Sequence, residues 1–208
     1  MRLKDDIADA LSASTHLGER PGIRERADAR LREENARLQA EVARLGARLQ
    51  QLQRDADSDA LVDTYNRRAF VRELARAQTV NARYHIPSVV LYFDLDDFKS
   101  VNDRYGHAVG DELLRQIGTV LCDSVRDCDL VARLGGDEFG VLLFKTTPEE
   151  ARAKAQSLVC RIQACAIDFP TGPVSVGASW GAAPCEPGTP AEAVIARADR
   201  AMYFDKAG

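Results

Sequence analysis

The sequence predicts an α+β domain, a sheet with flanking helices, preceded by an N-terminal coiled-coil helix. Leucines recur every seven residues from Leu31 to Leu52, which indicates the coiled coil. The pair Gly135-Gly136 separates two apolar runs, a pattern typical of a two-residue β-hairpin. From residue 67 onward, helical patterns alternate with strand patterns, and with the hairpin they predict a mostly antiparallel sheet.

Residues 1–26 form an N-terminal segment to which the sequence assigns no role. They are polar, a short helix over 5–11 fits their pattern, and Pro21-Gly22 predicts a break. The stalk is expected to follow at residues 27–57.

The stalk at 27–57 has the heptad pattern of a parallel coiled coil. Leucine at every d position, with Val42 at an a position, favours two parallel strands, and the polar Asn35 at another a position fixes their register. The favoured interpretation is a homodimer formed through this helix. A solitary amphipathic helix folded onto the domain stays open as an alternative, because only four heptads are present and Gly46 weakens the helix.

The remaining elements follow in order along residues 58–208. Apolar residues at helical or strand spacing predict helices over 67–82, 107–125, 148–166 and 190–206, and strands over 88–95 and 174–182 beside the hairpin at 135–136.

Composition excludes several classes of protein. The net charge of −4 over 208 residues argues against a general nucleic-acid binder, which is normally basic. No apolar run approaches the roughly 18 residues of a membrane-spanning helix, so no membrane insertion is expected. The first residues lack an apolar signal core, which favours a cytoplasmic location. The five cysteines show no zinc-like spacing and are interpreted as buried or idle thiols.

Acidic residues at two strand ends indicate a metal and phosphate site. Asp94 lies inside an apolar strand, where an aspartate is costly unless something compensates its charge, and it is the strongest metal-ligand candidate. Asp137 and Glu138 follow the glycine pair, and Lys99 lies shortly after Asp94. Carboxylates from two segments with a nearby lysine suit Mg²⁺ and a nucleoside triphosphate. The alternative is an ordinary hairpin whose acidic strand start is solvated.

Four stretches together resemble the successive motifs of the GGDEF diguanylate cyclases, in that family's order and spacing. They are Phe-Asp-Leu-Asp-Asp-Phe-Lys-Ser-Val-Asn-Asp (93–103), Gly-His-Ala-Val-Gly-Asp (106–111), Arg-Leu-Gly-Gly-Asp-Glu-Phe (133–139) and Ala-Asp-Arg-Ala-Met-Tyr-Phe-Asp-Lys (198–206). The resemblance covers residues 58–208 and implies a sheet of the nucleotide-cyclase or polymerase-palm kind. The entry segment departs from the family pattern, because Val62, Asp63 and Thr64 stand where threonine, glycine and leucine are usual.

The resemblance also implies catalytic and metal-binding roles. Asp94, Asp137 and the backbone carbonyl of Leu95 would bind Mg²⁺, with Mn²⁺ as a substitute. Asp137 would in addition accept the proton of a ribose 3′-hydroxyl. Glu138 points to the opposite face of its strand from Asp137 and is expected to help place metal or phosphate, with a structural role as the alternative.

Substrate contacts are carried over in the same way. Asn102 and Asp111 match the family's guanine readers, since a carboxylate accepts from guanine N–H groups that adenine lacks. From the residues alone, a turn-forming asparagine and an acid in the first turn of a helix explain these two positions as well. The other implied GTP contacts are Phe98, Lys99, His107, Gly135, Gly136 and Lys206.

The implied function is the condensation of two GTP molecules into cyclic di-GMP and two pyrophosphates. Each domain would hold one GTP, and the coiled coil would supply the facing half-site. Arg126 and Asp129 match an inhibitory site for the product. Two alternatives are a catalytically silent cyclic di-GMP receptor that uses Arg126 and Asp129, and an interaction module whose stalk recruits a regulatory protein.

Overall fold

The computed structural model describes residues 21–169 and 172–206, and the expected helix at 5–11 lies outside them. The chain divides into two compact units, of which the first ends at Gln53 and the second begins at Arg54. Within the described residues, no helix combines the length and the apolar character needed to cross a membrane.

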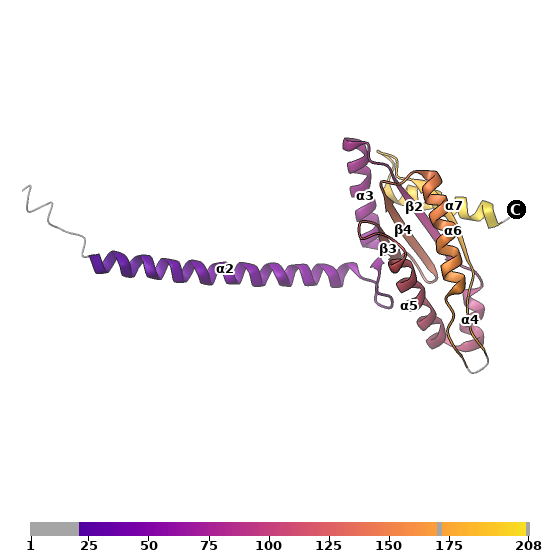
Figure 1. The fold of residues 1–208 in the computed structure, drawn as a ribbon, viewed down its shortest axis with the longest axis horizontal. Helices are drawn as coiled ribbons and strands as arrows, with labels where there is room; N and C mark the ends of the chain where they lie inside the picture. The colour runs from indigo at the N-terminus through magenta and orange to yellow at the C-terminus, as the bar shows by residue number, and fades with distance from the viewer. Residues whose placement is uncertain (1–20, 170–171, 207–208) are drawn as a thin grey trace, which may run out of the picture. The chain divides into compact units, whose positions relative to one another are not determined.

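Helix α2 runs from Pro21 to Asp57 (Figure 1). Proline suits the first helical position because its missing N–H would have no acceptor there, so the expected break at Pro21-Gly22 is the start of the helix. The large apolar side chains at the heptad positions are 47% to 70% exposed: Leu31, Leu38, Val42, Leu45, Leu49 and Leu52. These six residues, the apolar stripe, therefore lie open along α2.

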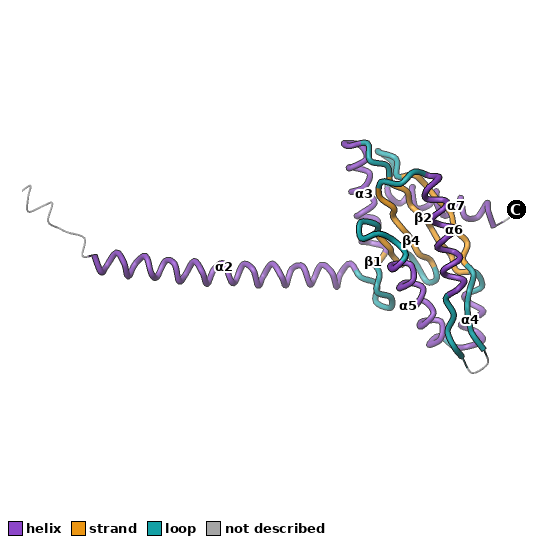
Figure 2. The backbone as a smooth tube through the Cα atoms, viewed as in Figure 1, coloured by secondary structure: helices purple, strands orange, loops and turns teal. Residues whose placement is uncertain are grey.

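The second unit is built on one five-stranded sheet with the order β1-β3-β4-β2-β5. Figure 2 shows the strands in orange among the purple helices. The strands are β1 (Tyr65–Asn66), β2 (Ser88–Leu95), β3 (Leu130–Arg133), β4 (Glu138–Phe144) and β5 (Ala178–Pro184). Only the pair β1–β3 is parallel, and the other pairs are antiparallel. The predicted α+β class and a hairpin between β3 and β4 are confirmed, but the four residues from Leu134 to Asp137 separate the strands, so the turn is longer than the expected two-residue turn at Gly135-Gly136.

Helices cover both faces of the sheet (Figure 1). One face packs against α3 (Arg67–Tyr84) and α7 (Ala191–Lys206), and the other against α4 (Phe98–Tyr105), α5 (His107–Asp123) and α6 (Pro148–Ala164). Successive residues of β2 alternate between these two layers: Val90 and Tyr92 join the α3–α7 layer, whereas Leu91 and Phe93 join the α4–α6 layer. Burial on both faces explains why β2 is an almost continuous apolar run.

Three elements differ from the sequence prediction, one of which is the two-residue strand β1, which was not predicted. Helix α4 was not predicted, because it is short and begins after Asp97, which has a left-handed backbone with φ 53°. The last strand begins at Ala178 rather than at residue 174, because Val174 pairs with Ile167 in an isolated bridge instead of joining the sheet.

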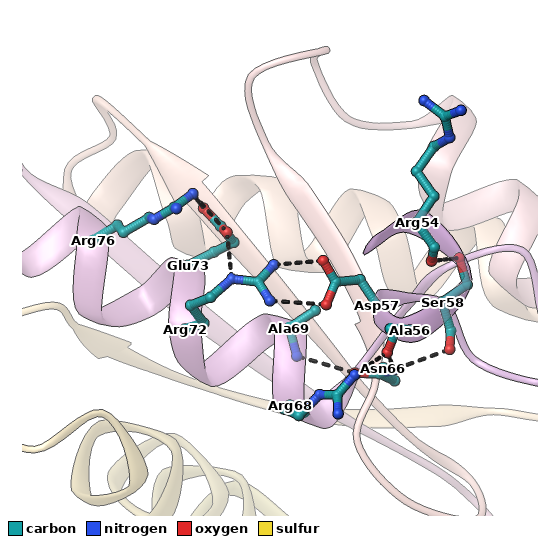
Figure 3. Close-up of polar contacts among 10 residues, drawn as sticks. All are labelled: Arg54, Ala56, Asp57, Ser58, Asn66, Arg68, Ala69, Arg72, Glu73 and Arg76. Carbon is teal, nitrogen blue, oxygen red and sulfur yellow. Dashed lines mark hydrogen bonds and ion pairs between the residues drawn. The ribbon is translucent and has the colours of Figure 1, made fainter. Parts of the chain in front are cut away.

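Asn66 joins the last turn of α2 to the start of α3 (Figure 3). Its Oδ1 accepts a hydrogen bond from the amide of Ala69 at 3.0 Å and so caps α3. Its Nδ2 donates to the carbonyls of Ala56 at 2.8 Å and Ser58 at 3.0 Å. Arg68 also donates to the Ala56 carbonyl. One side chain therefore provides acceptors and donors to two neighbouring helices.

Arg72 on α3 adds an ion pair to this junction. Its guanidinium binds both carboxylate oxygens of Asp57 at 2.8 Å (Figure 3). Hydrogen bonding to Arg72 lowers the pKa of Asp57 below its usual range. The pair is partly exposed, and its contribution to stability is therefore small.

Replacing Asn66 is expected to lower the free energy of unfolding. Asn66→Ala removes the cap of α3 and should cost about 1–2 kcal/mol. Asn66→Ser keeps an acceptor for the Ala69 amide and loses both Nδ2 donors without placing a charge beside the Ala56 and Ser58 carbonyls, so its cost should be smaller. Urea unfolding of the two variants and the parent protein measures the difference. Equal losses in both variants would show that the cap contributes nothing.

Candidate active site

The end of β2 and the start of β4 bring two acids to the same face of the sheet. Asp94 pairs with Glu138 in the antiparallel register, and directly opposed residues point to the same side. The amide of Leu95 donates to the carbonyl of Asp137 at 3.2 Å, so Asp137 continues the pairing just before β4 begins. All three acids are half-buried. Glu138, rather than Asp137, therefore lies opposite Asp94.

Tyr92 is a site residue that the sequence analysis missed. It is only 4% exposed, and it lies on the same face of β2 as Asp94. Its hydroxyl donates a hydrogen bond to the carboxylate of Glu138 on the neighbouring strand. Burial is the main cause that raises the pKa of Tyr92, and this hydrogen bond is the second. A tyrosine two positions before Asp94 in an otherwise apolar strand was the signal that could have found it.

Arg133 holds the turn between β3 and β4. Its guanidinium donates to the carbonyl of Gly135 at 3.1 Å and to that of Gly136 at 2.7 Å and 3.0 Å. A β-carbon at position 135 would lie 2.2 Å from Oε2 of Glu138, whereas one at position 136 would meet no atom within 4 Å. Glycine at position 135 thus leaves room for the Glu138 carboxylate, which would have to shift if a β-carbon were present.

The same guanidinium reaches the entry segment of the domain. Arg133 binds Asp59 at 3.2 Å, and the Asp59 carboxylate also accepts from the amides of Leu61 at 2.9 Å and Val62 at 3.1 Å. Burial alone would raise the pKa of Asp59, but these hydrogen bonds outweigh it and lower the pKa. Position 63 needs no glycine, because Asp63 is not among the described non-glycine residues with positive φ, which are His85, Asp97 and Lys145.

The start of α4 lies immediately after β2. Phe98 is 7% exposed and anchors the helix in the core, whereas Lys99 is exposed. The first amides of a helix have no intrahelical acceptor, and the Asp97 side chain makes no capping hydrogen bond to them. Amides in this position are suited to an anion such as a phosphate.

Asn102 packs beside Gly110, the residue before Asp111, where α4 meets α5. Gly106, with φ 85°, ends α4 and begins α5, a conformation that favours glycine. A β-carbon on Gly110 would lie 2.0 Å from Oδ1 of Asn102, so the Asn102 carboxamide packs directly beside the residue that precedes Asp111. His107 is the first residue of α5 and is exposed.

Arg126 and Asp129 form a separate turn before β3, at the opposite end of that strand from Gly135. The Asp129 carboxylate accepts from the amide of Arg126 at 3.1 Å and from the amide of Phe144 at 3.0 Å. The side chain of Arg126 is exposed. Lys206, another predicted contact, is the last residue of α7.

The oxygen donors at the strand ends fit a divalent cation that binds together with a phosphate ligand. In the described part of the chain, no three histidine, cysteine or acidic side chains gather closely enough to hold a metal by themselves. Mg²⁺ usually takes one or two carboxylates and completes its coordination with phosphate and water. The carboxylates of Asp94, Asp137 and Glu138 and the carbonyl of Leu95 are donors of this hard type.

The fold and this site define an α+β domain of the nucleotide-cyclase kind. A family model described as "Diguanylate cyclase, GGDEF domain" matches residues 56–208. The chain belongs to this family, as the sequence motifs predicted.

Curated relatives agree with this assignment. DgcE of Escherichia coli (strain K12), named a probable diguanylate cyclase, is 38% identical over 162 residues, which cover 77% of this chain and 15% of DgcE. The diguanylate cyclase TpbB of Pseudomonas aeruginosa (strain UCBPP-PA14) is 37% identical over 181 residues, which cover 86% of this chain and 38% of TpbB. The chain therefore spans a minor part of the length of these relatives.

Two solved structures align with most of this chain. The coiled coil and GGDEF domain of DgcB from Caulobacter crescentus, in complex with c-di-GMP, aligns with a TM-score of 0.74 at 29% identity, covering 86% of this chain and 95% of that one. The diguanylate cyclase SiaD from Pseudomonas aeruginosa, in complex with its activator SiaC, aligns with a TM-score of 0.69 at 28% identity, covering 99% and 85%.

Contact between Gly110 and Asn102 predicts the result of a double-mutant cycle. Gly110→Ala forces its new methyl group into the Asn102 carboxamide and should lower the free energy of unfolding by roughly 1–3 kcal/mol. In an Asn102→Ala background most of this cost should disappear, because the nearest clashing atoms are gone. Chemical denaturation of the four proteins measures the coupling.

Gly118→Ala is the matched control on the same helix. A β-carbon at position 118 would meet its nearest atoms, in Thr64 and Val62, at 3.4 Å, an ordinary contact distance. This variant should be close to the parent protein in stability. A Gly110→Ala cost that persists without Asn102 would contradict the assigned contact.

Proposed function

We propose that this protein is a diguanylate cyclase that condenses two GTP molecules into cyclic di-GMP and two pyrophosphates. The observation that carries the proposal is the pairing of Asp94 with Glu138 beside the Gly135-Gly136 turn, which gathers acids from two strands at one edge of the sheet. Membership of the GGDEF family supports it. A GTP substrate also favours a cytoplasmic location.

In this proposal each part of the site takes one portion of GTP. The start of α4, with the amides near Phe98 and the side chain of Lys99, receives the phosphates, helped by the backbone of the glycine turn and by Lys206. Asn102 and Asp111 read guanine, with His107 one helical turn before Asp111. Phosphoryl transfer needs mainly alignment and charge neutralisation, which such a site provides.

Asp137 has the chemical role in this scheme. The 3′-hydroxyl of one GTP loses its proton to Asp137, and its oxygen forms a bond to the α-phosphorus of the other GTP. The bond from that phosphorus to the bridging oxygen breaks, and pyrophosphate leaves. Mg²⁺, or Mn²⁺ in its place, held by Asp94, Asp137 and the Leu95 carbonyl, would neutralise the phosphate charge. Glu138 completes the acidic edge and is kept in place by Tyr92.

A second copy of the chain is required, because one domain holds one GTP. The apolar stripe along α2 is exposed and has the heptad spacing of a two-stranded coiled coil, so we assign it to a homodimer. Joining two domains raises the effective concentration of the facing half-site. SiaD in its complex with the activator SiaC gives a precedent for a regulatory protein, which we place on the stalk here.

Arg126 and Asp129 are proposed as an inhibitory site for cyclic di-GMP. Oδ2 of Asp129 accepts a hydrogen bond from the Arg126 amide and retains capacity for a guanine N–H group, whereas Oδ1 accepts from the Phe144 amide and the Cys128 thiol. The exposed Arg126 guanidinium can pair with guanine or phosphate. DgcB, which shares the fold, has been solved with c-di-GMP.

Turnover of GTP tests the proposed activity. The parent protein with GTP and Mg²⁺ should form cyclic di-GMP, and Asp94→Asn should lower the rate by at least about a hundredfold, because a carboxylate ligand is lost. Chromatography of the products measures both. Chelation of the metal should abolish formation of the product. A protein that binds cyclic di-GMP without making it would be a receptor, and the proposal would be wrong.

The stalk is tested by Leu38→Pro. Proline inside a helix costs ~3 kcal/mol, so this change should abolish dimerisation and activity together. Gln39→Ala, a neighbouring substitution outside the apolar stripe, should affect neither. Light scattering gives the mass of each variant, and specific activity is followed against protein concentration. Full activity in a monomeric variant would refute the role of the stripe.

A further inference from the structure

The turn from β2 into α4 is held by a contact with the beginning of β5. The amide of Asp96 donates to the carbonyl of Gly177 at 2.9 Å, which extends the β2–β5 pairing past the end of β2. The hydroxyl of Ser179 then donates to Oδ1 of the Asp96 carboxylate at 2.8 Å. The backbone of Asp96 is therefore held by Gly177, the residue before β5, and its side chain by Ser179 in β5.

The residues at and just before the start of β5 accommodate the Asp96 carboxylate. A β-carbon on Gly177 would lie 2.7 Å from Oδ2 of Asp96, so glycine leaves the space that the carboxylate occupies. Ser179 stands directly opposite Asp94 in the register, and its hydroxyl reaches two positions further along the neighbouring chain. Both Asp96 and Ser179 are half-buried, where a hydrogen bond to a charged group is stronger than in water.

The backbone directly after Asp96 is in an uncommon conformation. Asp97 has φ 53° and its side chain makes no cap for α4. Aspartate adopts this conformation more readily than most non-glycine residues, but it is still uncommon and is favoured by neighbouring contacts that hold it. The contact between Asp96 and Ser179 is adjacent to Asp97 and therefore helps to decide the direction in which α4 begins.

We infer that Asp96 and Ser179 are a positioning pair that aims the first amides of α4, and Lys99 with them, at the phosphates of bound GTP. This inference rests on the proposed function. The body of α4 has separate anchors, because Phe98 and Val101 are buried in the core and Asn102 packs beside Gly110. The pair therefore acts on the phosphates more than on guanine.

Comparison of GTP with GMP binding isolates this effect. In Ser179→Ala the dissociation constant for GTP should rise about tenfold, the size of one lost hydrogen bond to a charged group, while that for GMP should change less than about twofold. Ser179→Thr keeps a hydroxyl and should restore GTP binding. Ser175→Ala, at an exposed serine of the preceding segment, is the matched control. Calorimetric titration in the presence of Mg²⁺ gives all these constants.

A double-mutant cycle of Asp96→Ala and Ser179→Ala tests whether the two side chains affect GTP binding through their mutual contact. The double variant should bind GTP no more weakly than Asp96→Ala alone, because the two side chains act through one contact. Asp96→Asn keeps an oxygen acceptor for Ser179 and should bind GTP better than Asp96→Ala. Because Ser179→Ala is conservative, it keeps the test valid if Asp96→Ala fails to fold.

Specific results would overturn the inference. Unchanged GTP binding in Ser179→Ala would show that Asp96 and Ser179 do not position the phosphate site. An equal loss of GTP and GMP binding would show that the substitution disturbs the whole site. Loss of GTP binding in Asp96→Asn, with Ser179→Ala unaffected, would make Asp96 a direct ligand of metal or phosphate. A parent protein that binds no GTP overturns the proposed function as well, whereas GTP binding that is insensitive to Ser179 overturns the pair alone.

Discussion

Pairing between β2 and β4 is the constraint on which the rest of the structure depends. It runs from Ser88 opposite Phe144 to Asp94 opposite Glu138, so one register sets both the centre of the sheet and the acids at its edge. A shift by one residue would turn every side chain of β2 to the other face. Tyr92 would then enter the apolar layer under α4–α6, and its hydroxyl would lose Glu138, which is costly in a buried place. Burial of the core and placement of the acids are therefore secured by the same contacts.

Elements whose information is local could be predicted from the sequence. The strand ending at Leu95 has the predicted bounds, because an apolar run followed by acids marks both its length and its end. The hairpin at Gly135-Gly136 follows from the glycine pair between apolar runs. Asp96, which precedes the left-handed Asp97, is hydrogen-bonded to Ser179 far along the chain, so the start of α4 carried no local pattern from which it could be predicted. The two-residue strand β1 was likewise too short to give a pattern.

The candidate site was predictable in its residue types and less so in its pairings. Asp94 was singled out because an acid in an apolar strand is unusual, and in the structure it pairs with Glu138 next to the glycine hairpin. Which acid lies opposite it depends on the register, and an apolar pattern alone does not give the register. Tyr92 was passed over because its ring fits an apolar strand, and its hydroxyl has meaning only once Glu138 is placed. The contact of Asp96 with Ser179 joins residues 83 positions apart.

Arg133 gives the domain a direct mechanical connection between its entrance and its acids. One guanidinium grips Asp59, just after the last residue of α2, and the carbonyls of Gly135 and Gly136, just before Asp137. A load applied to the chain at Asp59 thus reaches the glycine turn through a polar bridge, without passing through the hydrophobic interior. A displacement of Asp59 therefore either moves the Gly135-Gly136 turn with it or breaks one of the contacts of the Arg133 guanidinium.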